Sequence, residues 1–397
     1  MVRTQLTPID AGQAADLARA AGVPVPVEQS AAWDRFDAAM PGRSPWMRLA
    51  YQEDGADLAV VALSEYRGRG FRYLWAKHGP VWLLPQGQRP TPEQEARFRA
   101  ALVRAVHRAD RGIAFVRLHA WERAADTLEL LQTMPHDRTV VVPLWAVPAP
   151  APKGKGGRKG GGGGAPSAPA QDAPHVPAGE KQPVDDDALM SSFKSRGRRD
   201  LRKGLRENPL DTRDVTGLSR AEFDELYAVL VETAGRDAFG IADVGTYWTM
   251  IDALGPEHAR VFIARSDTGE LVAWNIVTVH DSVGVAYYGA STANGRRMRG
   301  PEQLYWFIMR TLRDEGVREF DFLGIDSERA PRLAGVSEFK RKFSEEITEV
   351  AGPWDVPVRP LVYRGLLGAL AAKRGAVAGA RAGVARVKGL VARGAGE

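Results

Sequence analysis

A glycine- and proline-rich segment near the middle of the chain constrains its fold more than any other feature. Residues 149–184 consist largely of proline, glycine, alanine and lysine, and Gly160–Gly164 is a run of five glycines. A segment of this composition cannot bury enough apolar surface to offset the conformational entropy that it loses on ordering. We therefore predict a disordered Gly/Pro/Lys linker with a folded domain on each side of it.

Length and composition also indicate two folded domains. The chain has 397 residues, more than one ordinary hydrophobic core accommodates, and 44% of them are hydrophobic. It contains no cysteine, which excludes thiol catalysis, disulfides and cysteine-ligated metal sites. We divide the chain into an N-terminal domain (1–148), the linker (149–184), a C-terminal catalytic domain (185–345), a segment returning to the N-terminal domain (346–360) and a basic, weakly amphipathic tail (361–397).

The sequence indicates a protein of the cytoplasm. The first residues lack the charged head, apolar run and small-residue cleavage site of a signal peptide. No stretch of about 18 apolar residues is present, so we expect no membrane-spanning helix. The basic tail leaves open a peripheral contact with the inner face of an anionic membrane.

Strands and helices alternate in the N-terminal domain. Leu58–Leu63 and Ile113–Leu118 are apolar runs typical of buried strands, and Thr139–Leu144 is a further β-branched strand. Thr91 followed by proline and an acidic first turn predicts a helix from Pro92 to Arg111.

The C-terminal domain repeats this alternation. We expect a basic helix over Ala188–Asn208 and a second helix that starts at the capping box Ser219–Glu222. The turn Asp267–Gly269 joins two strands of a hairpin. A helix over Pro301–Glu315 then leads to the strand Glu319–Leu323. This order resembles an acetyltransferase-like (GNAT) layer, and we predict an α/β protein with two tandem GNAT-like domains.

Four motifs in the C-terminal half occur in an informative order. They are Thr233-x-x-Arg236-Asp237-x-Phe239, Tyr287-Tyr288-Gly289-Ala290-Ser291, Phe320-Asp321-Phe322-x-Gly324-Ile325 and Phe339-Lys340-x-x-Phe343. In this order they resemble the FemABX family, enzymes that move an amino acid from aminoacyl-tRNA onto a peptidoglycan precursor. The resemblance is good over Leu189–Tyr363 and loose before the linker. It implies two tandem GNAT-like domains.

The resemblance implies that Lys340, with Phe339 beside it, is catalytic. An amine that attacks an ester builds an oxyanion, and a fixed cation beside that oxygen can lower the barrier by about 3 kcal/mol. The alternative is purely structural. Phe339 and Phe343 would pack on one face of a short helix while Lys340 faces water.

Substrate-binding roles are implied for Arg236, Thr233, Tyr287 and Tyr288. The guanidinium of Arg236 could fork onto a phosphate or carboxylate of the acceptor. It could equally pair with Asp237 at a helix C-terminus. Adjacent strand residues point to opposite faces, so we expect one of the two tyrosines to lie in the core.

Positive charge is concentrated on the first helix of the C-terminal domain. The net charge of the chain is +5. The cluster is a candidate contact for the phosphates of tRNA, and the alternative is a solvated helix face. Its residues are Arg196, Arg198, Arg199, Arg202 and Lys203.

Two positions depart from patterns that related proteins would show. The family carries a phosphate-contacting lysine soon after the N-terminal Trp33, and here that position is Asp37. Either Arg35 or Arg43 replaces the lysine, or the acceptor is held differently. The segment Arg297–Glu302 resembles an acetyltransferase pyrophosphate loop but ends on an acid, which would repel the pyrophosphate of acetyl-CoA.

We therefore predict a monomeric aminoacyltransferase whose partners are aminoacyl-tRNA and a muropeptide precursor, lipid-linked or nucleotide-linked. Glycine is the preferred donor amino acid by resemblance alone. We expect no cofactor, since the aminoacyl ester is already activated, and no metal, since the histidines lack ligand spacing. Two alternatives remain: an acetyl-CoA-dependent N-acetyltransferase, and a non-catalytic adaptor that binds RNA or membranes.

Overall fold

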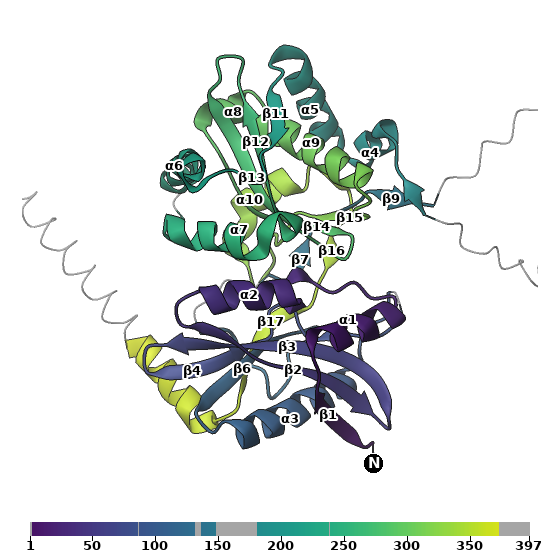
Figure 1. The fold of residues 1–397 in the computed structure, drawn as a ribbon, viewed down its shortest axis with the longest axis vertical. Helices are drawn as coiled ribbons and strands as arrows, with labels where there is room; N and C mark the ends of the chain where they lie inside the picture. The colour runs from purple at the N-terminus through teal and green to yellow at the C-terminus, as the bar shows by residue number, and fades with distance from the viewer. Residues whose placement is uncertain (1, 86, 132–135, 148–180, 238, 373–397) are drawn as a thin grey trace, which may run out of the picture.

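Two β-sheets, each flanked by helices, lie one above the other along the long axis of the protein (Figure 1). The computed structural model describes residues 2–372, apart from 86, 132–135, 148–180 and 238. The linker expected at 149–184 thus falls almost entirely outside the described residues, as does the tail beyond residue 372. The α/β class expected from the sequence is confirmed.

The first sheet is formed mainly by the N-terminal part of the chain. Its strand order is β1-β2-β3-β4-β6-β17, with the short β5 paired to β3, and only β4 and β6 are parallel. The strands are β1 (Thr4–Pro8), β2 (Arg43–Glu53), β3 (Ala56–Gly68), β4 (Phe71–Trp75), β5 (Val81–Trp82), β6 (Ile113–Ala120) and β17 (Gly352–Pro357). The helical segments of this part are α1 (Ala11–Ala20), η1 (Val27–Gln29), α2 (Ala31–Ala39) and α3 (Pro92–Ala109).

The second sheet has the order β11-β12-β13-β14-β15-β8, and only β14 and β15 are parallel. Its strands are β8 (Val141–Pro143), β11 (Asp211–Asp214), β12 (Ala259–Arg265), β13 (Leu271–His280), β14 (Val283–Ser291) and β15 (Glu319–Asp321). Its helices are α4 (Asp186–Ser192), α5 (Ser195–Glu207), α6 (Arg220–Asp237), α7 (Val244–His258), α8 (Ala293–Arg297), α9 (Gly300–Asp314), η2 (Pro331–Leu333) and α10 (Ala334–Lys340). Two small ladders pair β9 (Trp145–Ala146) with β10 (Gln182–Pro183) and β7 (Arg138–Thr139) with β16 (Thr348–Glu349).

Chain segments cross between the two sheets in both directions. The sequence places the strand Thr139–Leu144 in the N-terminal domain, but β8 pairs with β15 at the edge of the second sheet. In return, β17 pairs with β6 at the edge of the first sheet. Each sheet is therefore completed by a strand from the other half of the chain.

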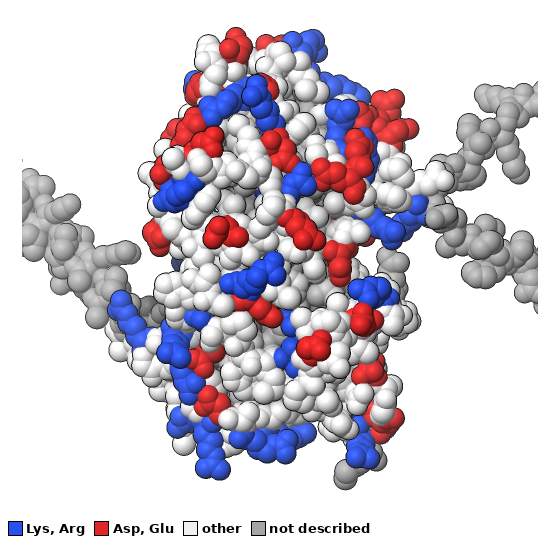
Figure 2. Space-filling view, viewed as in Figure 1, with Lys and Arg blue, Asp and Glu red and all other residues white. Residues whose placement is uncertain are grey.

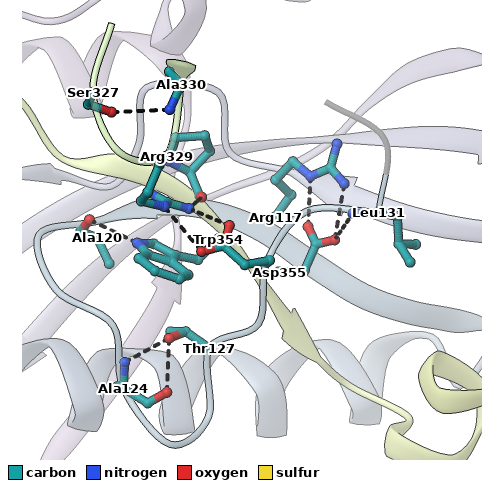
Figure 3. A network of polar contacts seen from close by, with 12 residues as sticks. Arg117, Ala120, Ala124, Thr127, Leu131, Ser327, Arg329, Ala330, Trp354 and Asp355 are labelled. Carbon is teal, nitrogen blue, oxygen red and sulfur yellow. Dashed lines mark hydrogen bonds and ion pairs between the residues drawn. The ribbon is translucent and has the colours of Figure 1, made fainter. Parts of the chain in front are cut away.

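A buried polar network holds β17 in the first sheet (Figure 3). Asp355 is fully buried, and both of its carboxylate oxygens accept from Arg117 of β6, at 2.7 and 3.1 Å. The hydroxyl of Tyr363 donates to the same carboxylate at 2.9 Å. Trp354, which precedes Asp355, has the guanidinium of Arg329 over its ring, 3.7 Å from the ring centroid. Arg329 also donates to the backbone carbonyl of Pro353. The loop after β15 is therefore attached to β17 by the side chain of Arg329 as well as through the backbone.

Capping signals were reliable guides to where helices begin. Thr91 and Gln94 form the capping box of α3, and Ser219 and Glu222 form that of α6. The single helix expected over 188–208 is instead two helices, α4 and α5. Phe193 between them has extended backbone angles and is fully buried, because its ring inserts between Trp306 and Phe343.

The start of the basic tail is a helix over residues 360–372 that packs against the first sheet. Tyr363, Leu366 and Leu370 lie on its inner face, against a cluster that includes Phe115. The apolar side chains of this helix are therefore packed within the protein. No helix in the described part of the chain is long and apolar enough to cross a membrane.

We expect Asp355→Asn to lower the free energy of unfolding by about 3–5 kcal/mol, because it removes the negative charge from a fully buried ion pair with Arg117. Asp16→Asn serves as the control. It breaks an ion pair with Arg19 that is more than 70% exposed, and it should cost less than about 1 kcal/mol. Equilibrium urea unfolding measures both, and equal effects would contradict the role given to the Arg117–Asp355 pair.

Candidate active site

The loop that follows β15 presents two backbone carbonyls to one lysine. The carboxylate of Asp321 accepts from the backbone N–H of Leu323 at 2.7 Å and from the hydroxyl of Thr139. Leu323 has a φ of 56°, a left-handed conformation that is uncommon outside glycine. The carbonyls of Leu323 and Gly324 both accept from Nζ of Lys340, the latter at 2.8 Å.

Lys340 ends α10 and does not face open water. Burial lowers the pKa of its ammonium to about 8, and the nearby carboxylate of Asp321 only partly offsets this. An ammonium has three N–H donors, and two of them are directed to the loop carbonyls. Among the described residues, the third N–H has no hydrogen-bond acceptor and can serve an incoming negative oxygen.

The two phenylalanines of the motif are packing residues that hold α10 in place. Phe343 is buried and stacks on Phe322 with ring centroids 4.6 Å apart. Phe339 contacts Phe343 at 5.3 Å and Tyr305 at 5.8 Å. The two rings therefore pack together, as the structural alternative expected, but Lys340 does not face water as that alternative required. A catalytic role for Phe339 stays a prediction.

Three histidines from separate elements meet next to this loop, and sequence reasoning missed them. The rings of His78 and His119 stack at 4.8 Å, and His136 lies 5.8 Å from His78. Burial lowers the pKa of each imidazole, to about 4 for His136, so all three are neutral near pH 7. Their spacing in the sequence carries no signal, since β6 and the two loops approach one another only in the fold.

A lysine and a tyrosine join the two halves of the protein close to the histidines. Nζ of Lys77 bonds the hydroxyl of Tyr287 and lies 4.4 Å from the ring centroid of Trp33. Burial lowers the pKa of Lys77 and raises that of Tyr287. In Figure 1, α2 and α7 face each other across the same boundary, where Arg35 donates to the carbonyl of Ala253.

The expectation that Tyr287 and Tyr288 point to opposite faces is wrong. The ladder between β13 and β14 shifts register at this point, so that Tyr287 is an extra residue in β14. A bulge of this kind places two successive side chains on one side. The two rings lie 5.2 Å apart, both are partly buried, and both pack against the cluster that contains Trp33.

Arg236 and Thr233 attach α6 to the end of β14. The hydroxyl of Thr233 accepts from the backbone N–H of Ser291 at 3.2 Å, and Arg236 donates to the carbonyl of Ser291 at 2.9 Å. The remaining donors of Arg236 fork onto Asp237, each at 3.1 Å. This is the helix-terminal pairing proposed as the alternative, and a substrate role for these residues stays a prediction.

A shallow basic groove of about 670 Å³ runs along α5. In Figure 2, lysine and arginine side chains gather at the upper right, where Figure 1 places α5. Four of the five expected tRNA contacts line the groove, and Arg196 instead pairs with Glu338 at 2.6 Å. The lining residues are Ser195, Arg198, Arg199, Arg202, Lys203, Arg206 and Glu207.

Asp37, the position at which the family carries a lysine, is buried and bonded. It accepts from the hydroxyl of Tyr66 at 3.1 Å and lies 3.5 Å from Arg43. Arg43 is therefore engaged with Asp37, and Arg35 with Ala253. A phosphate would have to compete with these contacts at either arginine.

The site that acetyl-CoA would need at the start of α9 is filled by protein. Glu302 in its first turn is buried and accepts from Nζ of Lys342 at 2.7 Å, and Lys342 also bonds Asp200 of α5 at 2.9 Å. A side chain at Gly204 of α5 would lie 2.9 Å from Arg299, so α5 packs directly on this end of α9. Since a pyrophosphate binds at a helix N-terminus with free N–H groups, these residues do not fit acetyl-CoA.

Comparison with known structures identifies the architecture. The crystal structure of FemX matches over 91% of this chain and 100% of that chain, with a TM-score of 0.64 and 13% sequence identity. The chain has the FemX fold. The resemblance to the FemABX family is thus confirmed at the level of the fold, as is the prediction of two tandem GNAT-like domains.

A family model described as an acetyltransferase (GNAT) domain matches residues 191–341, which form an acyltransferase-type enzyme domain. Two other structures are similar at lower TM-scores. The tandem GNAT protein from the clavulanic acid biosynthesis pathway is 13% identical over 90% of this chain and 99% of that chain, with a TM-score of 0.43. L-PGS from Bacillus licheniformis is 12% identical over 91% of this chain and 97% of that chain, with a TM-score of 0.45. A search of curated proteins gave no match.

Proposed function

We propose that this protein transfers an amino acid, glycine by preference, from aminoacyl-tRNA to the side-chain amine of a peptidoglycan precursor. The observation that carries the proposal is the desolvated ammonium of Lys340, fixed by two loop carbonyls with one donor left over. A cation held in this way suits an oxyanion, because its position is set before the charge develops. The FemX fold supports this chemistry over other uses of a GNAT-like domain.

The reaction needs little beyond position and charge. The acceptor amine attacks the ester carbonyl, and the carbonyl oxygen becomes negative. The free N–H of Lys340 then donates to that oxygen, which stabilises the tetrahedral intermediate. The ester is already activated, so this step needs no cofactor. The packing of Phe339 and Phe343 keeps α10, and with it Lys340, in place.

The basic groove on α5 supports a place for the tRNA. Its arginines are largely exposed, and they belong to the same domain as Lys340. The acceptor would lie against Tyr287 and Tyr288, with Arg236 as a further contact once it exchanges Asp237 for a substrate oxygen. Such an enzyme would work in the cytoplasm, on a lipid-linked or nucleotide-linked muropeptide.

The test is transfer of labelled glycine from glycyl-tRNA to a muropeptide acceptor, followed by mass spectrometry of the product. We expect a new amide on the acceptor amine and no dependence on acetyl-CoA. Acetylation of the acceptor with acetyl-CoA, and no transfer from aminoacyl-tRNA, would overturn the proposal.

We expect the pH dependence of kcat/KM to report the ionisation of Lys340. The rate should rise with pH as more acceptor amine becomes neutral, and level off above about pH 8, where Lys340 loses its proton. In Lys340→Arg the guanidinium stays protonated, so the rise should continue past that point. Lys340→Met should lower kcat by about 100-fold or more. A levelling-off at the same pH in Lys340→Arg would show that another group causes it.

We expect the triple variant Arg199→Gln, Arg202→Gln and Arg206→Gln to weaken tRNA binding and its salt dependence. Loss of three phosphate contacts should reduce the slope of log K against log salt by about 2 to 3. The matched control replaces Arg104, Arg108 and Arg111 by glutamine, since these are also exposed, similarly spaced, and lie on and just after α3 in the other domain. Filter binding with tRNA at several salt concentrations measures both, and equal slopes would remove the groove from the tRNA site.

A further inference from the structure

We propose that the imidazole of His136 takes up the proton that the acceptor nitrogen loses during aminoacyl transfer. The inference rests on the proposed function and adds a second catalytic residue beside Lys340. It comes from the fold alone, since His136 lies far from Lys340 in sequence and in no motif.

The ring of His136 packs against the loop after β15, whose carbonyls bind Lys340. A Cβ atom added to Gly324 would lie 2.8 Å from Cγ of His136, so the ring rests directly on the glycine backbone. The carbonyl of the same Gly324 accepts from Nζ of Lys340 at 2.8 Å. Gly324 thus contacts both groups: its carbonyl accepts from Lys340, and its α-carbon packs against the ring of His136.

The other two histidines lie in a cluster with His136, and one of them is fixed by a backbone carbonyl. Nδ1 of His119 bonds the carbonyl of Ala351 at 2.9 Å, and His78 lies between His119 and His136. His78 and His136 are only partly buried. A reactant at the boundary of the two domains could therefore reach the ring of His136.

The charges around His136 suit a base that acts late in the reaction. Burial, and after it the charge of Lys340, hold the pKa of His136 at about 4, so the ring is neutral and ready to accept a proton. An oxyanion formed beside Lys340 would cancel that charge, and the imidazole would become more basic as the surplus proton appears. The titratable groups that interact with the ring are Lys340, Glu28, Asp137, Lys77, His78 and His119.

The proton balance closes within the site. The neutral amine attacks the ester carbon, a C–N bond forms, and the carbonyl electron pair moves to the oxygen beside Lys340. The nitrogen then carries one surplus proton, which passes to His136. When the intermediate collapses, the C–O ester bond breaks and the leaving ribose oxygen takes the proton back from the imidazolium. The products are an amide and a free ribose hydroxyl, with His136 neutral again.

The test compares His136→Ala and His136→Gln in the transfer assay with the full-length protein. Both should lower kcat by about 100-fold while KM for either substrate stays within about twofold. Imidazole derivatives of similar size should restore activity to His136→Ala, more strongly as their basicity increases. The control is Gly335→Ala in α10, the helix that ends at Lys340. An added Cβ meets open space there, so the activity of this variant should equal that of the wild type.

Two outcomes would overturn the inference. One is wild-type kcat in His136→Gln, since glutamine fills a similar volume but is no base, and the ring would then serve packing only. The other is rescue that does not depend on the basicity of the imidazole. Absence of transfer by the wild-type protein is a different result, because it would reject the proposed function itself.

Discussion

The two sheets exchange edge strands, and this exchange fixes how the two halves of the chain pack together. β8 completes the second sheet and β17 completes the first, so neither sheet is closed by its own half of the chain. The buried pair of Arg117 and Asp355 fixes the return of β17. A buried ion pair adds little net stability, but breaking it is costly, so the pair favours the one register in which Asp355 lies opposite Arg117. The position of α10 relative to the first sheet follows from this, since α10 is tethered through β16 and β17.

The boundary between the sheets gathers ionisable groups in a low-dielectric setting. Burial favours the neutral forms of His78, His119 and His136, and it lowers the pKa of Lys77 and Lys340. Such shifts occur where side chains are held for chemistry at the expense of solvation. Lys340 is the member of this group whose charge is supported by two fixed carbonyls, which distinguishes it as the electrostatic centre.

In the second domain, α5 packs against the start of α9 with one face and carries a basic groove on the other. Gly197 lets α5 approach Lys342, just beyond α10, and Gly204 lets it approach the start of α9, so closely that an added Cβ would lie within 3 Å of neighbouring atoms. The inner face of α5 then supplies Asp200 to the buried cluster with Lys342 and Glu302. Its outer face carries the basic groove. One helix thus covers the start of α9 and presents positive charge to solvent.

Much of the local structure could be predicted from short-range residue patterns. The α/β class, the starts of α3 and α6 at Thr91 and Ser219, and the hairpin turn at Asp267–Gly269 all follow from capping and turn chemistry between near neighbours. The motif around Lys340 also located the centre of the candidate site. Other features depend on contacts between distant segments and could be seen only in the folded protein. They are the crossing of β8 and β17, the break at Phe193, the bulge at Tyr287 and the meeting of His78, His119 and His136. Each of them is set by packing between segments far apart in the chain, which no local pattern of residues records.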